Sequence, residues 1–289
     1  MKHRTGFTLV ETALAMSFIA VLLISVFAIM NRMTVIYQKT LTIRSVNAAG
    51  REIMDDISRF AGASTLPNRK AMCNGLSGEY FTNCVNDSGY KYVYHQFYSN
   101  NFEVNGRYPD AELPTSGVFC TGRYTYLWNT GYVLNPENKT AENYRATLKY
   151  TVGSDSEVST SDFKLLRVID VGSKICASNL NGNTYDITRA ANDVSYSISL
   201  SEPPVELLDS SESQLALYDF KVFRPARHYV SGHAFYSGTF ILATLQGDVD
   251  ITASGDYCTS PPEGYMGEFT YCAINKFNFA TRATGESDV

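Results

Sequence analysis

A long apolar segment close to the N-terminus constrains the fold of this chain most. From Phe7 to Met30 the only charged residue is Glu11, and no proline occurs before Pro67. At 1.5 Å per residue, a helix over these residues would be about 36 Å long, enough to cross a hydrocarbon core of roughly 30 Å. Because Lys2 and Arg4 precede the segment, the positive-inside rule predicts a cytoplasmic N-terminus, with the rest of the chain outside.

Two common interpretations of this segment conflict with its flanks or with its one acid. An ordinary secretory signal has a shorter apolar core followed by a small-x-small cleavage site, whereas here Asn31-Arg32-Met33 follows. A plain signal anchor has no use for Glu11, since a charge at depth in the bilayer costs a few kcal/mol. Alternatively, Glu11 merely lies at the membrane surface, where a helix N-terminus tolerates an acid.

The segment Gly6-Phe7-Thr8-Leu9-Val10-Glu11, with its basic leader, resembles the class III signal of type IV prepilins over about residues 1–30. The resemblance implies a leader of residues 1–6, cleavage between Gly6 and Phe7 by the prepilin peptidase, and N-methylation of Phe7. It also implies that Glu11 of one subunit pairs with the Phe7 amine of its neighbour and sets their axial register. In an apolar filament core, such a pair costs much less than an unpaired charge.

Beyond the membrane segment, the same helix is expected to continue with one apolar side. Charged residues such as Arg44, Asp55, Asp56 and Arg59 would form its wet face, and the helix should span residues 7–62. A coiled-coil dimer is the alternative, although Lys39 and Gly50 interrupt the heptad. The apolar stripe consists of Ile36, Ile43, Val46, Gly50, Ile53, Ile57 and Phe60.

Residues 63–289 predict a β-rich globular domain outside the cytoplasm, because Tyr, Asn, Ser, Thr and Gly replace the apolar run. The expected fold class is α+β, with an antiparallel sheet packed on the second half of the helix, which is the pilin arrangement. The expected strands are 90–98, 124–128, 146–152, 163–171, 194–200, 215–223 and 235–245, and extended loops are expected over 68–87, 100–116 and 172–192.

The six cysteines all follow residue 70 and form no CxxC pair. This pattern favours disulfides in an oxidising compartment over a zinc site. Many pairings remain open, and spacing favours Cys258 with Cys272 first, leaving Cys73 with Cys84 and Cys120 with Cys176 by elimination. The disulfide candidates are therefore Cys73, Cys84, Cys120, Cys176, Cys258 and Cys272.

Enzyme chemistry, metals and cofactors are not expected. The net charge of −5, or −7 once Lys2 and Arg4 leave with the leader, lacks the footprint of a nucleic-acid binder. No GxSxG, HExxH or phosphate-loop motif occurs. The basic-aromatic segment 224–229 and the turn residues around 179–183 and 248–256 are better explained as polar loops than as DNA or calcium sites. The four histidines are His3, His95, His228 and His233.

A second resemblance, to the larger minor pilins and pseudopilins of the PilW/PulJ type, rests on Leu165-Leu166-Arg167, the strand pair within 215–245, and Arg51–Ile57. It implies a minor pilin in the initiating or tip complex of a type IV pilus. The implied partners are other pilin subunits, the prepilin peptidase, the inner-membrane assembly platform and membrane lipid through residues 7–30. A type II secretion pseudopilin and a pilus-displayed adhesin or DNA-binding module are the alternatives.

Overall fold

A computed structural model gives the architecture of the chain. The described residues are 8–64, 94–99, 113–134, 147–153, 163–171, 175, 196–208, 215–223, 235–244 and 273–283. The elements are α1 (Leu9–Gly62), β1 (Tyr94–Ser99), β2 (Leu113–Cys120), β3 (Tyr124–Asn129), α4 (Gly131–Leu134), β4 (Leu148–Val152), β5 (Leu165–Ile169), β6 (Tyr196–Leu200), β7 (Val205–Leu208), β8 (Leu215–Phe223), β9 (Phe235–Thr244) and β10 (Ile274–Arg282). The expected α+β class is confirmed.

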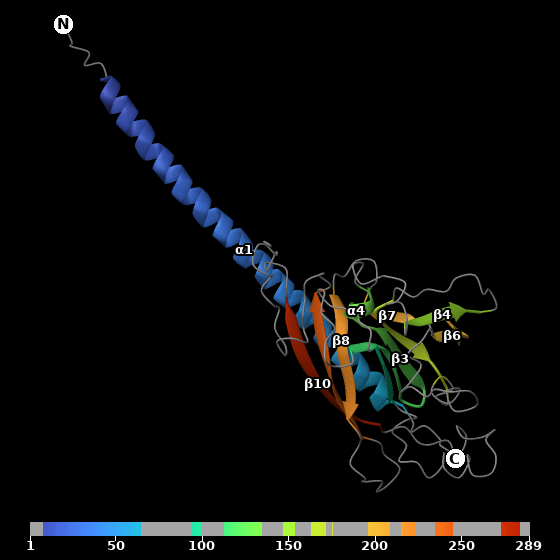
Figure 1. Cartoon of the computed structure of the whole chain (residues 1–289). Coiled ribbons are helices and arrows are strands. Elements are labelled where there is room, and N and C mark those ends of the chain that lie inside the picture. The colour runs from blue at the N-terminus through green and yellow to red at the C-terminus, as the bar shows by residue number, and fades with distance from the viewer. Residues whose placement is uncertain are drawn as a thin grey trace, which may run out of the picture.

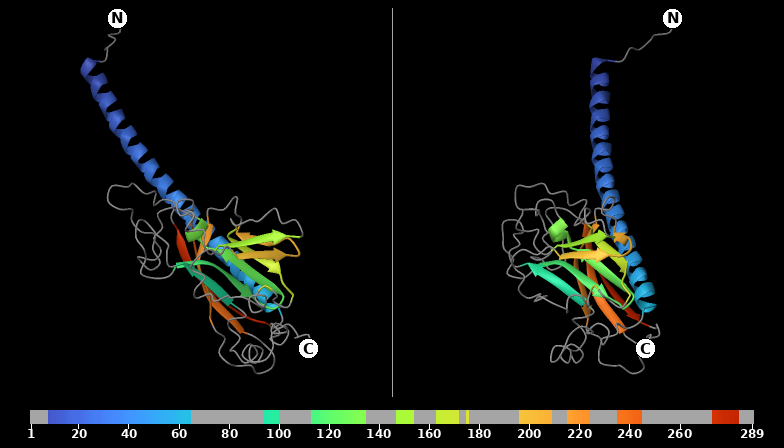
Figure 2. Two further views of the ribbon diagram at one scale, coloured as in Figure 1. Left: turned by 45° about the vertical axis from the view of Figure 1, so that its right-hand side comes forward. Right: turned by 90° about the vertical axis from the view of Figure 1, so that its right-hand side faces the viewer.

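Helix α1 is a single uninterrupted element, as the absence of proline predicts. Its N-terminal half projects away from the β-rich part of the molecule, and its C-terminal half lies along it (Figures 1 and 2). The helix ends where expected: the Ala63 N–H donates to the Arg59 carbonyl at 3.1 Å, and the Ser64 N–H donates to the Ala61 carbonyl at 3.3 Å. These bonds satisfy carbonyls that would otherwise be left open at the helix end.

The apolar stripe of α1 is buried over a shorter length than the sequence predicts. Val46 is the first buried residue, whereas Ile36 is 65% exposed and Ile43 is 44% exposed. The reason is the length of β10, which lies against α1 and begins at Ile274, beside the point where Asn275 Nδ2 donates to Asn47 Oδ1 at 2.7 Å. The described strands therefore leave the stripe bare before Val46.

The strands in the described part of the chain form three sheets rather than the single antiparallel sheet expected. A five-stranded sheet has the order β1-β2-β3-β5-β7, a three-stranded sheet has the order β10-β9-β8, and both are antiparallel. The third, β4 with β6, is a parallel pair, which corrects the expectation for these two strands. Seven expected strands are found, β8 with the predicted ends and the others with shifted ends; β2, β7 and β10 were not expected, and β2 overlaps the predicted loop over 100–116.

Aromatic side chains fill the space between the sheets and α1. The Trp128 and Phe220 rings lie 4.5 Å apart, and Phe240 stacks on Phe277 at 5.2 Å. Phe277 also faces α1 at Gly50, where an added Cβ would come within 2.2 Å of the ring. Ile53 is fully buried in the same cluster. The C-terminal half of α1 is therefore part of the domain core, and the two cannot separate without opening it.

Candidate functional site: the exposed half of α1 and its seat on the domain

The N-terminus of α1 is closed by a capping box between Thr8 and Glu11. The Thr8 N–H donates to Glu11 Oε2 at 2.9 Å, the Thr8 hydroxyl donates to the same oxygen at 3.0 Å, and the Glu11 N–H donates to Thr8 Oγ1 at 3.4 Å. The carboxylate is exposed and held at the helix N-terminus, where a negative charge is favourable. Gly6 and Phe7 lie outside the described residues.

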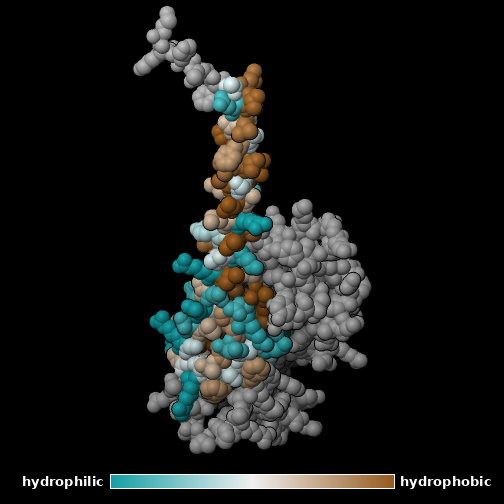
Figure 3. All heavy atoms as spheres, turned by 90° about the vertical axis from the view of Figure 1, so that its left-hand side faces the viewer, coloured by the Kyte–Doolittle hydropathy of each residue, from teal (hydrophilic) through white to brown (hydrophobic). Residues whose placement is uncertain are grey.

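The following turns of α1 form an apolar column with no covering element among the described residues. Every residue from Thr8 to Tyr37 is exposed. Figure 3 shows hydrophobic residues dominating this half of the helix, with hydrophilic ones gathering where it lies beside the domain. By length and composition, this one helix could cross a membrane. The serines of this half bond inside the helix, Ser17 to the Leu14 carbonyl and Ser25 to the Leu22 carbonyl, both at 2.8 Å, so their hydroxyls need no water.

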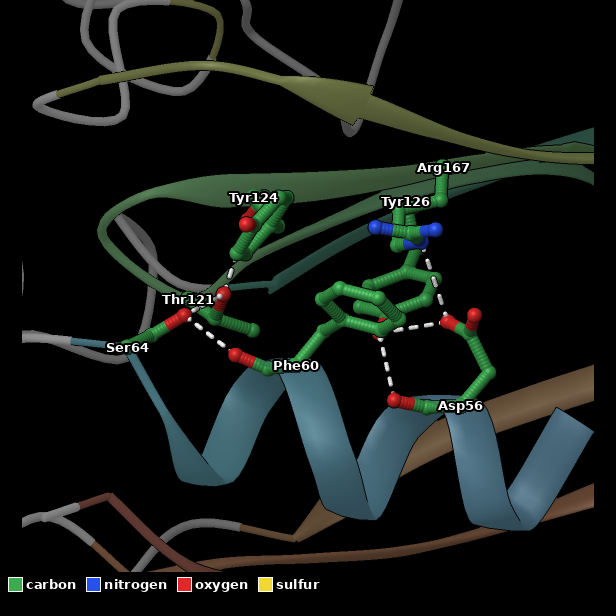
Figure 4. Close-up of polar contacts among 7 residues, drawn as sticks. All are labelled: Asp56, Phe60, Ser64, Thr121, Tyr124, Tyr126 and Arg167. Atoms are coloured by element: carbon green, nitrogen blue, oxygen red, sulfur yellow. Dashed lines mark hydrogen bonds and ion pairs between the residues drawn. The ribbon is translucent and has the colours of Figure 1, made fainter. Parts of the chain in front are cut away.

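Helix α1 contacts the five-stranded sheet through a cluster of four side chains, Asp56, Phe60, Tyr126 and Arg167 (Figure 4). Arg167 Nε lies 3.2 Å from Asp56 Oδ1, and each side chain is 12% exposed. The Tyr126 hydroxyl donates to Asp56 Oδ1 at 3.0 Å. The Arg167 guanidinium also lies over the Phe60 ring, 3.4 Å from its centroid. One strand residue thus contacts two α1 side chains one turn apart.

Burial governs the protonation of this cluster. Desolvation raises the pKa of Asp56 above its ordinary value, and the Arg167 guanidinium and the Tyr126 hydroxyl offset only part of the rise. Burial, with the Asp56 charge beside it, also raises the pKa of Tyr126, so this hydroxyl stays protonated as a donor. One turn further on, the Ser64 and Thr121 hydroxyls hydrogen-bond at 2.9 Å and fix the end of α1 to the start of the β2–β3 turn.

Cys120 is the one cysteine candidate among the described residues, and it is disulfide-bonded and fully buried at the end of β2. The other five cysteines, its partner among them, lie outside the described residues, so the pairing stays a prediction. The basic-aromatic segment 224–229 and the turns around 179–183 and 248–256 also lie outside them. Within the described ranges, no group of three His, Cys, Asp or Glu residues could hold a metal ion.

Two features of the site differ from the sequence prediction. Asp56, expected on the wet face of α1, is drawn inward by Arg167 from β5, a residue more than a hundred positions later in the chain. Thr8 has a role that the prediction missed, although Thr8-Leu9-Val10-Glu11 has the Thr-x-x-Glu spacing of a capping box. Local spacing could have found Thr8, whereas no local pattern could have paired Asp56 with Arg167.

Comparison with known proteins does not identify a relative. No protein-family model, curated protein or solved structure matches the chain. The functional argument therefore depends on the residues and geometry described above.

Proposed function

We propose that this chain is a structural minor pilin of a type IV pilus, processed after Gly6 and assembled through α1. One observation carries the proposal: a single uninterrupted helix combines a bare apolar half, from Leu9 to Tyr37, with a second half built into the core of the domain. A soluble protein has no reason to keep so long an apolar helix in water. A filament of such subunits buries the bare halves together and displays the domains outside.

In this proposal the subunit first lies in the cytoplasmic membrane through residues 7–30, with its N-terminus in the cytoplasm. The prepilin peptidase removes residues 1–6 and leaves a Phe7 amine, which is then methylated. The assembly platform moves the subunit from lipid into the filament, in the initiating or tip complex. Glu11 then exchanges its contacts with Thr8 for the Phe7 amine of the neighbouring subunit, and this charge pair sets the register.

The proposal is tested by the mass of the mature N-terminus and by the presence of the chain in sheared surface filaments. We expect a chain that begins at methylated Phe7 and is recovered with filaments. Glu11→Ala should be cleaved normally but be lost from the filament fraction while remaining in the membrane. An intact Met1, or unchanged recovery of the Glu11→Ala chain in filaments, would contradict the proposal.

The same observations fit a pseudopilin of a type II secretion system, because a pseudopilin would be processed and assembled through the same kind of N-terminal helix. The phenotype of a gene deletion distinguishes between these two functions. Loss or reduction of surface filaments with normal protein export supports the pilus. Blocked export with intact filaments would assign the chain to secretion instead.

A further inference from the structure

The face of the three-stranded sheet that is turned away from α1 is covered at one end and bare at the other. At the covered end the short helix α4 packs on it, with the Tyr132 ring edge-on to the Tyr218 ring at 5.0 Å and Ile241 buried in the same cluster. Directly paired residues of antiparallel strands point to the same side, so the pairing register identifies the side chains of the bare end. The exposed charged, amide and aromatic residues there, which form the bare sheet face, are Lys221, Phe223, Phe235, Lys276, Asn278 and Arg282.

Two aromatic rings are exposed on the bare sheet face. Phe223 is 50% exposed and Phe235 is 51% exposed, whereas the other four phenylalanines of the same three strands are buried. Phe223 pairs with Ser237, two residues from Phe235, so the two phenylalanines are diagonal neighbours with Cβ atoms about 7 Å apart. The residues between them and β10, Ser237 and Ala280, have small side chains. Both rings are therefore available to a ligand with flat apolar surfaces.

The bare sheet face is basic, although the whole chain has a net charge of −5. The acid among its described neighbours, Asp219, already pairs with Lys221 at 2.7 Å. Lys276 and Arg282 form no ion pair with another described residue. They are six positions apart on β10, or about 20 Å, and only uncharged residues lie between them. The face therefore matches an anionic partner whose charges are widely spaced.

The size and position of the bare sheet face exclude two kinds of partner. The face extends about 20 Å along the strands and about 10 Å across them, or roughly 200–300 Å², whereas each side of a standard protein interface buries about 800 Å². It also lies at the far end of α1, because Thr281, next to Arg282, donates its hydroxyl to the Ser58 carbonyl at 3.2 Å. Ser58 is about 40 Å along the helix from Met30, so a membrane crossed by residues 7–30 is out of reach.

The spacing of charge separates the two remaining classes of polymer. A nucleic acid has a phosphate at every nucleotide, so most of its charges would find no cation on this face and would be repelled by the acidic chain. A polysaccharide with carboxylates on alternate sugar rings has the sparse charge that Lys276 and Arg282 match. The C–H faces of its rings can pack on Phe223 and Phe235, and its hydroxyls can hydrogen-bond to the Asn278 amide.

We propose that the bare sheet face binds an acidic polysaccharide whose carboxylates lie on alternate rings. The inference deepens the proposed function by naming the class of ligand that the domain contacts. Display of the face outside the cell rests on that function, whereas binding itself does not. In a subunit assembled through α1, the bare sheet face lies at the end of the domain farthest from the membrane segment.

Binding of the full chain in detergent micelles to hyaluronan oligosaccharides tests the proposal, because hyaluronan has a carboxylate on alternate rings. At about 0.15 M salt we expect an affinity at least about tenfold higher than for neutral dextran of the same length, falling as salt rises. Microscale thermophoresis measures both. No binding of hyaluronan, or equal affinity for the two glycans, would overturn the proposal. Tighter binding of an oligothymidylate than of hyaluronan would assign the face to nucleic acid instead.

Substitutions test whether the bare sheet face is the binding site. Arg282→Gln, Lys276→Gln and Phe235→Ser should each weaken hyaluronan binding by about threefold or more. Matched controls are Arg51→Gln, at an exposed cation of α1, and Val205→Ser, at a 48% exposed residue of β7, and both should bind as wild type does. Urea unfolding midpoints identify the variants that are folded. Unchanged affinity in the folded variants of the face, or an equal loss in the controls, would contradict the assignment.

The two proposals fail in different ways. A wild-type chain that keeps residues 1–6 and never enters filaments would refute the proposed function and leave hyaluronan binding in micelles unaffected. A wild-type chain that is cleaved and enters filaments, but does not bind hyaluronan, would refute the inference alone.

Discussion

The guanidinium of Arg167 lies 3.4 Å from the centre of the Phe60 ring, while its Nε lies 3.2 Å from Oδ1 of Asp56. Phe60 and Asp56 are one turn apart on α1, so a single side chain from β5 contacts both. The planar guanidinium can stack and pair at once, which a lysine ammonium cannot. This arrangement fixes both the rotation of α1 about its axis and its position along the sheet.

Arg167→Met should lower the free energy of unfolding by about 3 kcal/mol, because it leaves the Asp56 charge partly buried without its partner. The unfolding free energy of Arg167→Lys should lie between those of Arg167→Met and wild type, since lysine keeps the charge and loses the stacking on Phe60. Urea unfolding in detergent micelles, followed by fluorescence of the buried and single Trp128, measures both. Lys221→Ala, at an ion pair whose lysine is 54% exposed, is the control and should cost less than about 1 kcal/mol.

The raised pKa of Asp56 predicts how its contribution depends on pH. Since the pKa is higher in the folded chain than in the unfolded one, the contribution is complete below the unfolded value and falls as pH rises through the folded one. The unfolding free energy of wild type minus that of Asp56→Asn should therefore fall from about pH 3.8 upward and level off above the folded pKa. A difference that rises over this window would show that the ion pair outweighs burial.

The sequence predicted the parts of this fold that depend on local pattern. The apolar run without proline predicted α1, and the strands expected over 215–223 and 235–245 correspond to β8 and β9. β2 was missed because it contains Pro114 and Gly117, which are unfavourable in strands. Its buried residues Thr115 and Ser116 are polar, so they add nothing to an apolar strand pattern. β10 was missed because the exposed residues of its outer face include the polar Lys276, Asn278 and Arg282. The ion pair of Asp56 with Arg167 could not be predicted from local sequence pattern, because it joins distant parts of the chain.

Gly50 is predicted to be required for the close contact between α1 and β10. In an exposed helix, Gly→Ala stabilises by up to about 1 kcal/mol. At Gly50, however, an added Cβ would lie 2.2 Å from the Phe277 ring, so Gly50→Ala should instead destabilise by about 1–3 kcal/mol. Phe277→Leu on its own also destabilises, but it should relieve part of the cost when combined with Gly50→Ala. A stabilising Gly50→Ala would refute the tight contact.

The disulfide of Cys120 should contribute substantially to stability. Cys120→Ser is expected to lower the free energy of unfolding by about 3 kcal/mol, because the cross-link restricts the unfolded chain and the site is fully buried. Peptide mapping without reduction identifies the partner, which the sequence predicts to be Cys176. A bond to another cysteine would refute that pairing, while an unchanged unfolding midpoint in Cys120→Ser would refute the stabilising role.

Variants of Thr8 and Glu11 distinguish the capping of α1 from the assembly of subunits. Glu11→Gln keeps an acceptor for the Thr8 N–H, so the cap should survive, but it removes the charge that a neighbouring Phe7 amine would need. Thr8→Val removes the hydroxyl that accepts from the Glu11 N–H, which should cost about 1 kcal/mol of local helix stability, and keeps the charge. We therefore expect faster amide exchange at residues 9–12 in Thr8→Val micelles, with normal recovery in filaments. Glu11→Gln should show the reverse, with slow exchange and a chain confined to the membrane. If both variants enter filaments equally, the Glu11 charge has no part in assembly. If Thr8→Val alone is excluded, the ordered cap rather than the charge is what the neighbouring subunit requires.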